Sequence, residues 1–200
     1  MSSLIRCGWA ETGSAADGDL YRDYHDTEWG GPLHGTPALF ERLSLEAFQS
    51  GLSWLIILRK RENFRAAFAG FDIPTVAGFT ETDVQRLLAD RGIVRNRAKI
   101  EATIANARVI ESGGLDLDEL LWSFAPPARA RPAGPSQIPA TSAESIRMAR
   151  HLKALGLRFV GPTTAYALMQ ATGMVDDHVA DCWVPVLGPP APIGNNRGVS

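Results

Sequence analysis

The stretch at residues 36–71, TPALFERLSLEAFQSGLSWLIILRKRENFRAAFAGF, decides the fold class. Apolar residues recur in it at intervals of three and four, which is the period of an α-helix with one buried face. The pattern breaks once, at SGLS, where Gly51 and Ser53 are typical of a helix end followed by the cap of a new helix. The stretch therefore predicts two helices joined by a tight junction.

The same helical period extends along most of the remaining chain. No strand-like alternation and no internal repeat interrupts it, so we predict an all-α fold. The stretch at 125–142, APPARARPAGPSQIPATS, is too rich in proline for a helix and predicts a loop or a boundary between lobes. Helices are expected at 80–90, at 95–112 before a Gly-Gly stop, at 117–124, at 142–157 and within 159–173.

The composition is that of a globular protein with one domain or two small lobes. Its 200 residues, 45% of them hydrophobic, suffice for a sizeable core, and no run approaches the roughly 20 apolar residues of a membrane span. The N-terminus lacks the pattern of a secretion signal, so we expect a cytoplasmic protein with reduced thiols or a metal instead of a disulfide framework. The net charge of −2 neither favours nor excludes nucleic acid.

Two short segments have the pattern of turns whose backbone amides bind phosphate. In LKALGLRFVGPTTAY, at 152–166, Gly156 ends one helix and the first amides of the next helix are free to bind an anion. A simple pair of antiparallel helices is the commoner explanation of such a pattern. A second piece, LADRGIVRNRAKI, contains Gly92 followed by basic residues, although a solvated helix face is the alternative. Its basic residues are Arg95, Arg97 and Lys99.

Two further stretches combine polar and apolar groups. Glu46 lies in the apolar run LSLEAFQSGLSW, so its carboxylate is expected on a buried or half-buried face, where it is costly without a partner or a role. A glutamate on the helix surface is the commoner outcome. The stretch at 19–32, DLYRDYHDTEWGGP, is dense in aromatic and polar side chains and indicates either a site or a core anchor for the N-terminus.

Six segments in register carry a family resemblance. RCGW, YHDTEWG, LEAFQSGLSW, LRKRENFRAAF, GIVRNRAKIEATIANAR and FVGPTTAYALMQATGMVDDHVADC follow one another as they do in the 3-methyladenine DNA glycosylase I family. The chain resembles this family from Cys7 to Cys182, which is nearly its whole length. The departures are an insertion, AETGSAADGD at 10–19, Phe48 where the family often has a second Gln, and a tail rich in Pro, Ala and Gly.

The resemblance implies one glycosylase domain over 1–200, with a family-matching region at 1–183 and an irregular tail at 184–200. Its fold would be the two-lobed helix-hairpin-helix fold of DNA glycosylases. The implied activity is base-excision repair, in which 3-methyladenine is flipped out of alkylated double-stranded DNA and its N-glycosidic bond is hydrolysed. The products would be an abasic site and free 3-methyladenine. A monomer without a membrane partner is expected.

The resemblance also implies a metal. In the family a zinc ion is bound by one Cys and one His from each end of the chain, which here are Cys7, His25, His178 and Cys182. One structural Zn²⁺ per chain would therefore join the two ends. A Cys2His2 set is a closed tetrahedral site, and His178 and Cys182 would share one helical face if their spacing is helical. A disulfide between the two cysteines and unrelated thiols are the alternatives.

The family match further implies a base pocket. Its aromatic residues would be Trp9, Tyr21, Tyr24 and Trp54, and Glu46 would accept hydrogen bonds from the amino edge of the base. Because 3-methyladenine in DNA is cationic, stacking on aromatic faces adds cation–π attraction. A non-catalytic DNA-binding module and a zinc-stabilised scaffold for protein partners are the competing classes, and neither needs a carboxylate among aromatic residues.

DNA contacts are implied at two places. The plug that fills the hole left by the flipped base would be Gln49, Gly51 and Leu52, with Leu52 as the apolar wedge. The alternative places Leu52 in the core. The DNA backbone would be bound by Gly161, Thr163, Thr164 and Arg158, with Arg95, Arg97 and Lys99 as weaker candidates.

Two carboxylates are candidates for the chemistry. Many helix-hairpin-helix glycosylases have an essential Asp in the region that is MVDDHV here, and Asp176 stands where the 3-methyladenine family commonly has Asn. Its neighbour is the expected zinc ligand His178, and a carboxylate beside a metal site often orients a ligand or is solvated. We therefore expect Glu46 to be the principal functional carboxylate, with Asp176 secondary.

Overall fold

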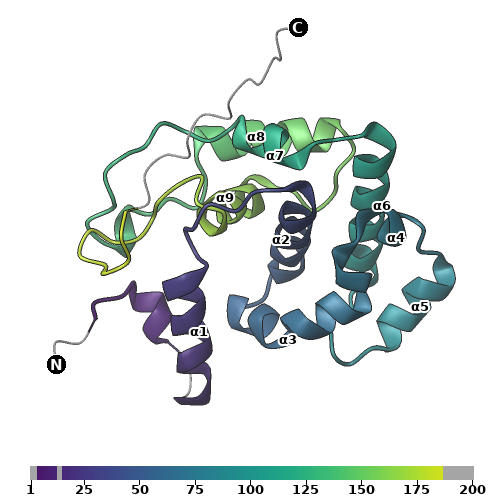
Figure 1. Ribbon diagram of the computed structural model, residues 1–200, viewed down its shortest axis with the longest axis horizontal. Coiled ribbons are helices and arrows are strands. Elements are labelled where there is room, and N and C mark those ends of the chain that lie inside the picture. Colours follow the sequence, from purple (N-terminus) through teal and green to yellow (C-terminus); the bar gives the residue numbers. More distant parts are fainter. Residues whose placement is uncertain (1–3, 13–14, 187–200) are drawn as a thin grey trace, which may run out of the picture.

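The computed structural model describes residues 4–12 and 15–186. Within these residues the chain forms helices and connecting segments and no strand (Figure 1), which confirms the predicted all-α class. The tail predicted at 184–200 lies mostly outside the described residues, as do positions 13 and 14 of the insertion. None of the described helices is long and apolar enough to cross a bilayer.

Most helices lie where the apolar period predicts them, to within a few residues. The period predicts neither α1 nor α4, because α1 is largely polar and α4 has only five residues. The helices are α1 (Ala15–Thr27), α2 (Thr36–Gln49), α3 (Trp54–Ala67), α4 (Ile73–Ala77), α5 (Glu81–Ala89), α6 (Arg97–Gly113), α7 (Leu117–Trp122), α8 (Ala143–Ala154) and α9 (Pro162–Ala171). Short 3-10 turns occur at Gly8–Glu11, Ala69–Phe71 and Pro135–Gln137.

Local sequence signals set several helix starts. Thr80 and Asp83 form a capping box at the start of α5, and the side chain of Asn96 accepts a hydrogen bond from the Lys99 amide at the start of α6. Ser142 accepts a hydrogen bond from the amide of Ser145 and so caps α8. These caps satisfy amides that a helix leaves without an internal partner.

The main core is built around α2. This helix lies in the middle of the molecule and contacts α3, α6, α7 and α9 (Figure 1). Phenylalanine rings continue the core from α2 into α3, where Phe48 lies 4.7 Å from Phe64 between ring centroids. Because α2 is buried along most of its length, polar residues on it, including Glu46, are held inside the protein.

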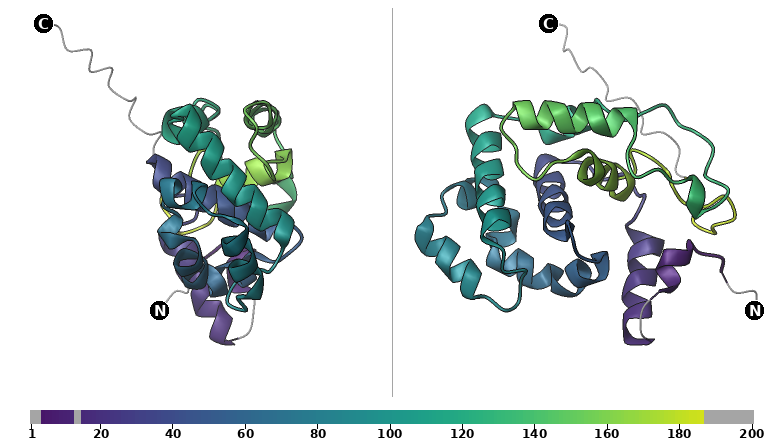
Figure 2. Two further views of the ribbon diagram at one scale, coloured as in Figure 1. Left: turned by 90° about the vertical axis from the view of Figure 1, so that its right-hand side faces the viewer. Right: turned by 180° about the vertical axis from the view of Figure 1, so that it is seen from behind.

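A second, smaller cluster lies apart from this core. It contains the buried residues Cys7, Val179, Cys182 and Val184, with Trp9 and Trp29 packed against them. The segments at 4–12 and 174–186 meet here at one end of the molecule, beside α1, in both views (Figure 1, Figure 2). The Trp183 amide donates a hydrogen bond to the Ile5 carbonyl at 2.9 Å, which joins the two segments directly.

Candidate active site and metal centre

The two ends of the chain bring four metal-ligating side chains together. Cys7, His25, His178 and Cys182 are buried, and one ligand atom from each lies within 4.8 Å of the others. The Cys182 sulfur is 3.5 Å from both His25 Nε2 and His178 Nδ1, and the Cys7 sulfur is 3.6 Å from His178 Nδ1. Both cysteines are free, so the structure contains no disulfide between them.

These distances fit a tetrahedral metal ion. Zinc bonds of about 2.3 Å to sulfur and about 2.0 Å to nitrogen, set at tetrahedral angles, place sulfur and nitrogen about 3.5 Å apart. The electrostatics point the same way. Burial raises the pKa of the Cys7 thiol to about 12 and lowers the pKa of His178 to about 4. Without a bound cation the thiol therefore stays protonated and the imidazole stays neutral, whereas a cation would compensate the charge of the thiolate.

The outer nitrogen of each histidine has an acceptor. His25 Nδ1 lies 2.8 Å from an Asp26 carboxylate oxygen, and His178 Nε2 lies 3.1 Å from the Trp29 carbonyl oxygen. An acceptor at the outer nitrogen holds the proton there and leaves the inner nitrogen free to bind a metal. His25 therefore presents Nε2 to the cluster and His178 presents Nδ1.

The segment that carries His178 and Cys182 is not a helix. Residues 176–182 form an irregular chain, in which the Cys182 amide donates a hydrogen bond to the Val179 carbonyl at 2.9 Å. The condition that their spacing be helical is not met, and a turn at 179–182 brings the two side chains together instead. The four residues that the family resemblance implies as zinc ligands do form one buried group that could hold a metal ion.

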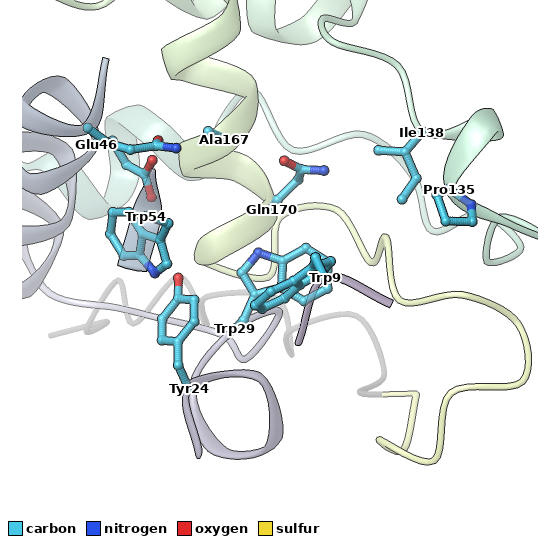
Figure 3. A pocket seen from close by; sticks show the side chains of 10 residues that line it. Trp9, Tyr24, Trp29, Glu46, Trp54, Pro135, Ile138, Ala167 and Gln170 are labelled. Atoms are coloured by element: carbon cyan, nitrogen blue, oxygen red, sulfur yellow. The ribbon is translucent and has the colours of Figure 1, made fainter. Parts of the chain in front are cut away.

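A cavity of about 350 Å³ lies between the terminal cluster and the helical core. In Figure 3, Glu46, Trp54 and Tyr24 gather on one side of the cavity, and Gln170, Ile138 and Pro135 lie on the other. Pockets of this size suit small organic molecules, which they hold with mostly apolar walls and a few placed polar groups. Its walls are Trp9, Tyr24, Trp29, Glu46, Gln49, Trp54, Pro135, Ile138, Ala167 and Gln170.

The aromatic wall also packs against the metal ligands. Trp9 and Trp29 meet edge to face with centroids 5.1 Å apart. Trp29 lies 4.6 Å from the His178 ring and Trp9 lies 5.4 Å from the His25 ring, again between centroids. The two histidines of the Cys/His cluster therefore support two walls of the cavity from behind.

Glu46 is the buried carboxyl group of this cavity. It is 4% exposed, and no donor in the described part of the chain binds its carboxylate. Burial raises the pKa of Glu46 to about 7, although Arg42 one helical turn earlier acts in the opposite direction. The cavity thus contains an acceptor whose charge is uncompensated by any direct hydrogen bond.

Arg42 and two aromatic residues complete this side of the cavity. Arg42 donates a hydrogen bond to the Tyr24 hydroxyl oxygen at 2.6 Å, which leaves the hydroxyl proton of Tyr24 free to be donated. The guanidinium lies 5.3 Å from the centroid of the Tyr24 ring and 5.6 Å from that of Trp54. The Trp54 indole N–H is buried and has no partner within the described residues. This side of the cavity therefore contains one strong acceptor, Glu46, and two donors, Tyr24 and Trp54, that bind no acceptor among the described residues.

Gln170 forms the opposite wall, and a second buried carboxylate orients it. Asp177 accepts hydrogen bonds from Gln170 Nε2 at 2.9 Å, from the Tyr166 hydroxyl at 2.6 Å and from Arg129 at 2.6 Å. Because a carboxylate only accepts, the Gln170 amide nitrogen must face Asp177. Its carbonyl oxygen is then turned toward the cavity, as Figure 3 shows.

Comparisons with known proteins identify the family. The family model described as methyladenine glycosylase matches residues 14–185. DNA-3-methyladenine glycosylase 1 of Escherichia coli (strain K12) is 43% identical over 184 residues, which cover 90% of this chain and 96% of that protein.

The chain belongs to the methyladenine glycosylase family. A crystal structure of 3-methyladenine DNA glycosylase I matches it with a TM-score of 0.83 at 42% identity, over 90% of this chain and 98% of that chain. The 3-methyladenine DNA glycosylase I of Staphylococcus aureus, whose structure is described as the basis of 3-methyladenine recognition, matches with a TM-score of 0.81 at 32% identity. That match covers 92% of this chain and 98% of the other.

Most of the pocket residues expected from the glycosylase resemblance do line the cavity, but Tyr21 does not. Trp9, Tyr24, Glu46 and Trp54 are all wall residues. The Tyr21 hydroxyl instead accepts a hydrogen bond from the Leu55 amide at 3.0 Å, at the start of α3, and its ring packs edge-on against Trp9. Tyr21 thus supports the wall and is not part of it.

Asp176 also lies outside the cavity of this glycosylase. Its carboxylate pairs with Arg131 at 2.8 Å and accepts a hydrogen bond from the His178 amide at 3.1 Å. These contacts orient the metal-ligating segment. The sequence pattern does not single out Gln170 or Asp177, although Asp177 is the residue next to Asp176 in MVDDHV. Trp29 stands in the aromatic stretch at 19–32, but the family match gives it no role in the pocket.

The expected plug residues occupy an exposed turn between α2 and α3. Leu52 is 37% exposed, which contradicts the alternative that it is a core residue. Gly51 has φ +81°, a left-handed conformation that favours glycine. Gln49 lies at the base of this turn and also lines the cavity.

The expected backbone-binding residues surround the start of α9. Gly161 precedes the helix, Thr163 is exposed in its first turn, and Thr164 is half-buried. Arg158 lies in the turn between α8 and α9, where its backbone is held by hydrogen bonds to the Asn106 side chain at 2.7 and 3.1 Å.

Two of the weaker basic candidates are engaged within the protein. Arg97 pairs with Glu81 and Glu101, each at 2.9 Å. Lys99 is buried and donates to two backbone carbonyls, so it is not available to a phosphate. Arg95 is exposed.

Proposed function

We propose that the protein excises 3-methyladenine from alkylated double-stranded DNA by hydrolysing its N-glycosidic bond. The observation that carries this proposal is the buried carboxyl group of Glu46, which faces a base-sized cavity between Tyr24 and Trp54 without a hydrogen-bond donor. A buried carboxylate without a partner is costly unless a ligand compensates it. Relatives named for activity on 3-methyladenine support the same substrate.

The chemistry of the substrate matches this cavity. In DNA the N3-methylated adenine carries a positive charge, so it gains cation–π attraction from Trp54 and Tyr24. Ionised Glu46 attracts the charge and accepts hydrogen bonds from the amino edge of the base. Neutral adenine offers no charge to compensate the buried carboxylate, and we expect it to bind poorly.

The reaction places modest demands on the protein. The bond between the sugar C1′ and the base N9 breaks with both electrons going to the base, which leaves as a neutral molecule. Water adds to C1′ and loses a proton to solvent. Because the leaving base starts as a cation, stabilising the flipped base and the positive transition state supplies much of the acceleration. Glu46 is the carboxylate placed to do this.

Binding to DNA would use the two exposed turns. Leu52 would enter the stack as the flipped base leaves it, with Gln49 and Gly51 forming the rest of the plug. The α8 and α9 pair would act as the helix-hairpin-helix element, with Gly161, Thr163, Thr164 and Arg158 at the DNA backbone. We infer that one monomer acts on one duplex.

The four-residue cluster would hold one Zn²⁺ as a structural ion. Two thiolates and two neutral imidazoles are the donor set that zinc prefers in closed sites, and each histidine is oriented by an outer acceptor. The ion would clip the two ends of the chain together. Elemental analysis of protein purified without chelator should give about one zinc per chain. Absence of zinc together with two freely titratable thiols would contradict this role.

The test of the activity is release of the base. Duplex DNA treated with a methylating agent is incubated with the protein, and the released bases are separated by chromatography. Heat or alkali then cleaves the strand at abasic sites. We expect clearly more free 3-methyladenine and more strand cleavage with the protein than in a protein-free control, which measures spontaneous loss of methylated bases. A protein that binds the duplex without releasing any methylated base would instead be a non-catalytic DNA-binding module.

Selectivity has a separate test. Quenching of tryptophan fluorescence measures the affinity of the protein for free 3-methyladenine and for adenine. We expect tighter binding of 3-methyladenine, because this more basic free base, although neutral in water, can take up a proton opposite the Glu46 carboxylate and so restore the charge pair. Its binding by Trp54→Ala and Tyr24→Ala should be weaker. Equal affinity of the unaltered protein for the two bases would rule out this explanation of selectivity.

A further inference from the structure

Lys99 is a buried cation that the proposed chemistry does not use. It is 7% exposed, although lysine is seldom buried without a partner. From α6 its ammonium group donates to the Phe48 carbonyl at 2.8 Å and to the Ser50 carbonyl at 2.5 Å. Burial lowers the pKa of Lys99, and no carboxylate among the described residues pairs with it. Its hydrogen bonds therefore go to the end of α2 and to the turn that follows.

The two carbonyls have different roles in that turn. The Phe48 carbonyl is among the last of α2, which lack a donor within the helix and attract a cation. The Ser50 carbonyl belongs to the central peptide of a four-residue turn, which the Leu52 amide closes by donating to the Gln49 carbonyl at 2.6 Å. Lys99 thus binds both the helix end and the turn itself.

The backbone angles identify this as a type II turn. Ser50 has φ −46° and ψ 116°, and Gly51 has φ +81°. A type II turn differs from a type I turn mainly in the orientation of its central peptide, which is flipped. The carbonyl that Lys99 binds is the one whose direction distinguishes the two. Lys99 therefore stabilises the turn type that this segment adopts.

The turn is bound from the protein interior by Lys99, and its outer surface is exposed to solvent. Ser50, Gly51 and Leu52 are exposed, whereas the ammonium that binds the turn is buried beneath them. A Cβ added at Gly51 meets no atom within 4 Å, so only the backbone conformation demands glycine there. The 49–52 turn is thus an exposed element whose conformation is fixed before it contacts DNA.

We propose that Lys99 is a positioning residue for base flipping. It holds the 49–52 turn in the conformation that points Leu52 at the DNA stack, so that insertion requires no ordering of the turn. This inference rests on the proposed role of Leu52 as the wedge. It concerns excision from the duplex, and binding of a free base to the cavity does not depend on it.

The test compares Lys99→Met with Lys60→Met. Methionine keeps most of the apolar stem and removes the donors. Lys60 is a matched control, because its ammonium also donates to two backbone carbonyls, those of Arg91 and Gly92, in a different loop. Each variant is measured for single-turnover excision from methylated duplex, for affinity toward free 3-methyladenine, and for fluorescence of a 2-aminopurine next to the lesion.

We expect Lys99→Met to slow excision about tenfold or more, as loss of a charge-assisted hydrogen bond allows, and to reduce the 2-aminopurine signal. Its affinity for the free base should stay within about twofold, and Lys60→Met should differ little from the unaltered protein. Excision at the unaltered rate by Lys99→Met overturns the inference. Equal losses of excision and of free-base affinity overturn it as well, because they indicate a damaged pocket.

Two more variants separate the possible failures. Gly51→Ala strains the same turn without touching Lys99, so it should reproduce the excision defect, and the double variant should lose less than the product of the two. The excision measurement on Gly51→Ala remains informative even if Lys99→Met does not fold. Leu52→Ala tests the wedge itself. If Leu52→Ala excises normally, the proposed wedge fails; if it is slow while Lys99→Met and Gly51→Ala are normal, only the inference about Lys99 fails.

Discussion

The helical body and the terminal cluster are held together in different ways. The body around α2 buries large side chains, such as Leu39, Phe40 and Phe48, at no measurable exposure. The terminal cluster buries only four apolar residues between segments that contain one 3-10 turn. Burial of apolar area stabilises the first, but the second has too little of it and needs a further link. The four metal-ligating residues lie where that link is needed.

The cavity lies on the border between these two regions. Glu46, Gln49 and Trp54 come from the helical body, whereas Trp9 and Trp29 are packed on the terminal cluster. Binding of the base therefore depends on both regions being in place. Changes that weaken one region and spare the other show how far the two are independent.

The largest effect is expected from replacing one of the four residues that we propose to bind zinc. Cys182→Ser should release the ion and expose amides at 4–12 and 174–186 to hydrogen exchange, while α6 and α9 stay protected. Structural zinc sites contribute about 10–16 kcal/mol of apparent binding free energy to small domains, so this variant should lower the Tm more than any change in the body. Excision should also fall, because Trp9 and Trp29 lose their support.

The matched control is Asp181→Asn, which alters an exposed carboxylate beside the ligand. It should keep the metal and the protection of both segments. If Cys182→Ser loses the ion and yet retains full protection of the terminal segments, the metal does not hold them.

A core substitution should show the opposite pattern. Phe48→Ala removes a ring that packs against Phe64 and Phe68, and such changes cost about 3–5 kcal/mol. We expect this loss in urea unfolding, with the metal content unchanged in the folded protein. Ile146→Ala, at an exposed position, should cost less than about 1 kcal/mol. Loss of the metal by folded Phe48→Ala would show that the two regions are not independent.

The cavity on their border should respond to pH. Because burial raises the pKa of Glu46 to about 7, the carboxyl is protonated below that pH and cannot compensate a cationic base. The kcat/KM reports ionisations of the free enzyme, so it should fall about tenfold per unit as the pH drops below 7 and level off above it. Glu46→Gln should have a low and flat profile. A flat profile of the unaltered protein between about pH 5 and pH 8 contradicts this assignment.

The smallest effect is expected at a helix cap of the body. Ser142→Ala removes the hydrogen bond to the Ser145 amide at the start of α8, which should cost about 1 kcal/mol. Ser136→Ala, at an exposed position before α8, is the control and should leave the Tm unchanged. If Ser142→Ala changes the Tm no more than Ser136→Ala does, packing alone sets the start of α8.

Sequence predicts the body better than the terminal cluster. Apolar periodicity is enough to place α2, α3 and α6, because each has a continuous buried face. The same periodicity does not find α1, whose residues are mostly polar. The spacing of His178 and Cys182 does not decide between a helix and a turn, since side chains four residues apart can meet in either, and the structure has a turn.

The candidate site likewise contains residues that the sequence predicts and residues that it does not. The family resemblance points to the four residues of the Cys/His cluster and to Glu46, since these stand in contiguous motifs. It does not separate Tyr21 from Tyr24, because only the position of α1 against α3 decides which hydroxyl faces the cavity. Gln170 and Asp177 were not predicted, because their roles arise from contacts among α9, the segment after it and Arg129.

The most direct test of the account compares two carboxylates, one in the cavity and one beside the metal. Single-turnover excision from methylated DNA is measured for Glu46→Gln and Asp176→Asn, each checked for retained metal. We expect Glu46→Gln to lose at least about a hundredfold, the lower end of general acid–base effects, while Asp176→Asn stays close to the unaltered protein. A hundredfold loss in Asp176→Asn with nearly normal excision by Glu46→Gln would contradict the assignment of the chemistry to the cavity.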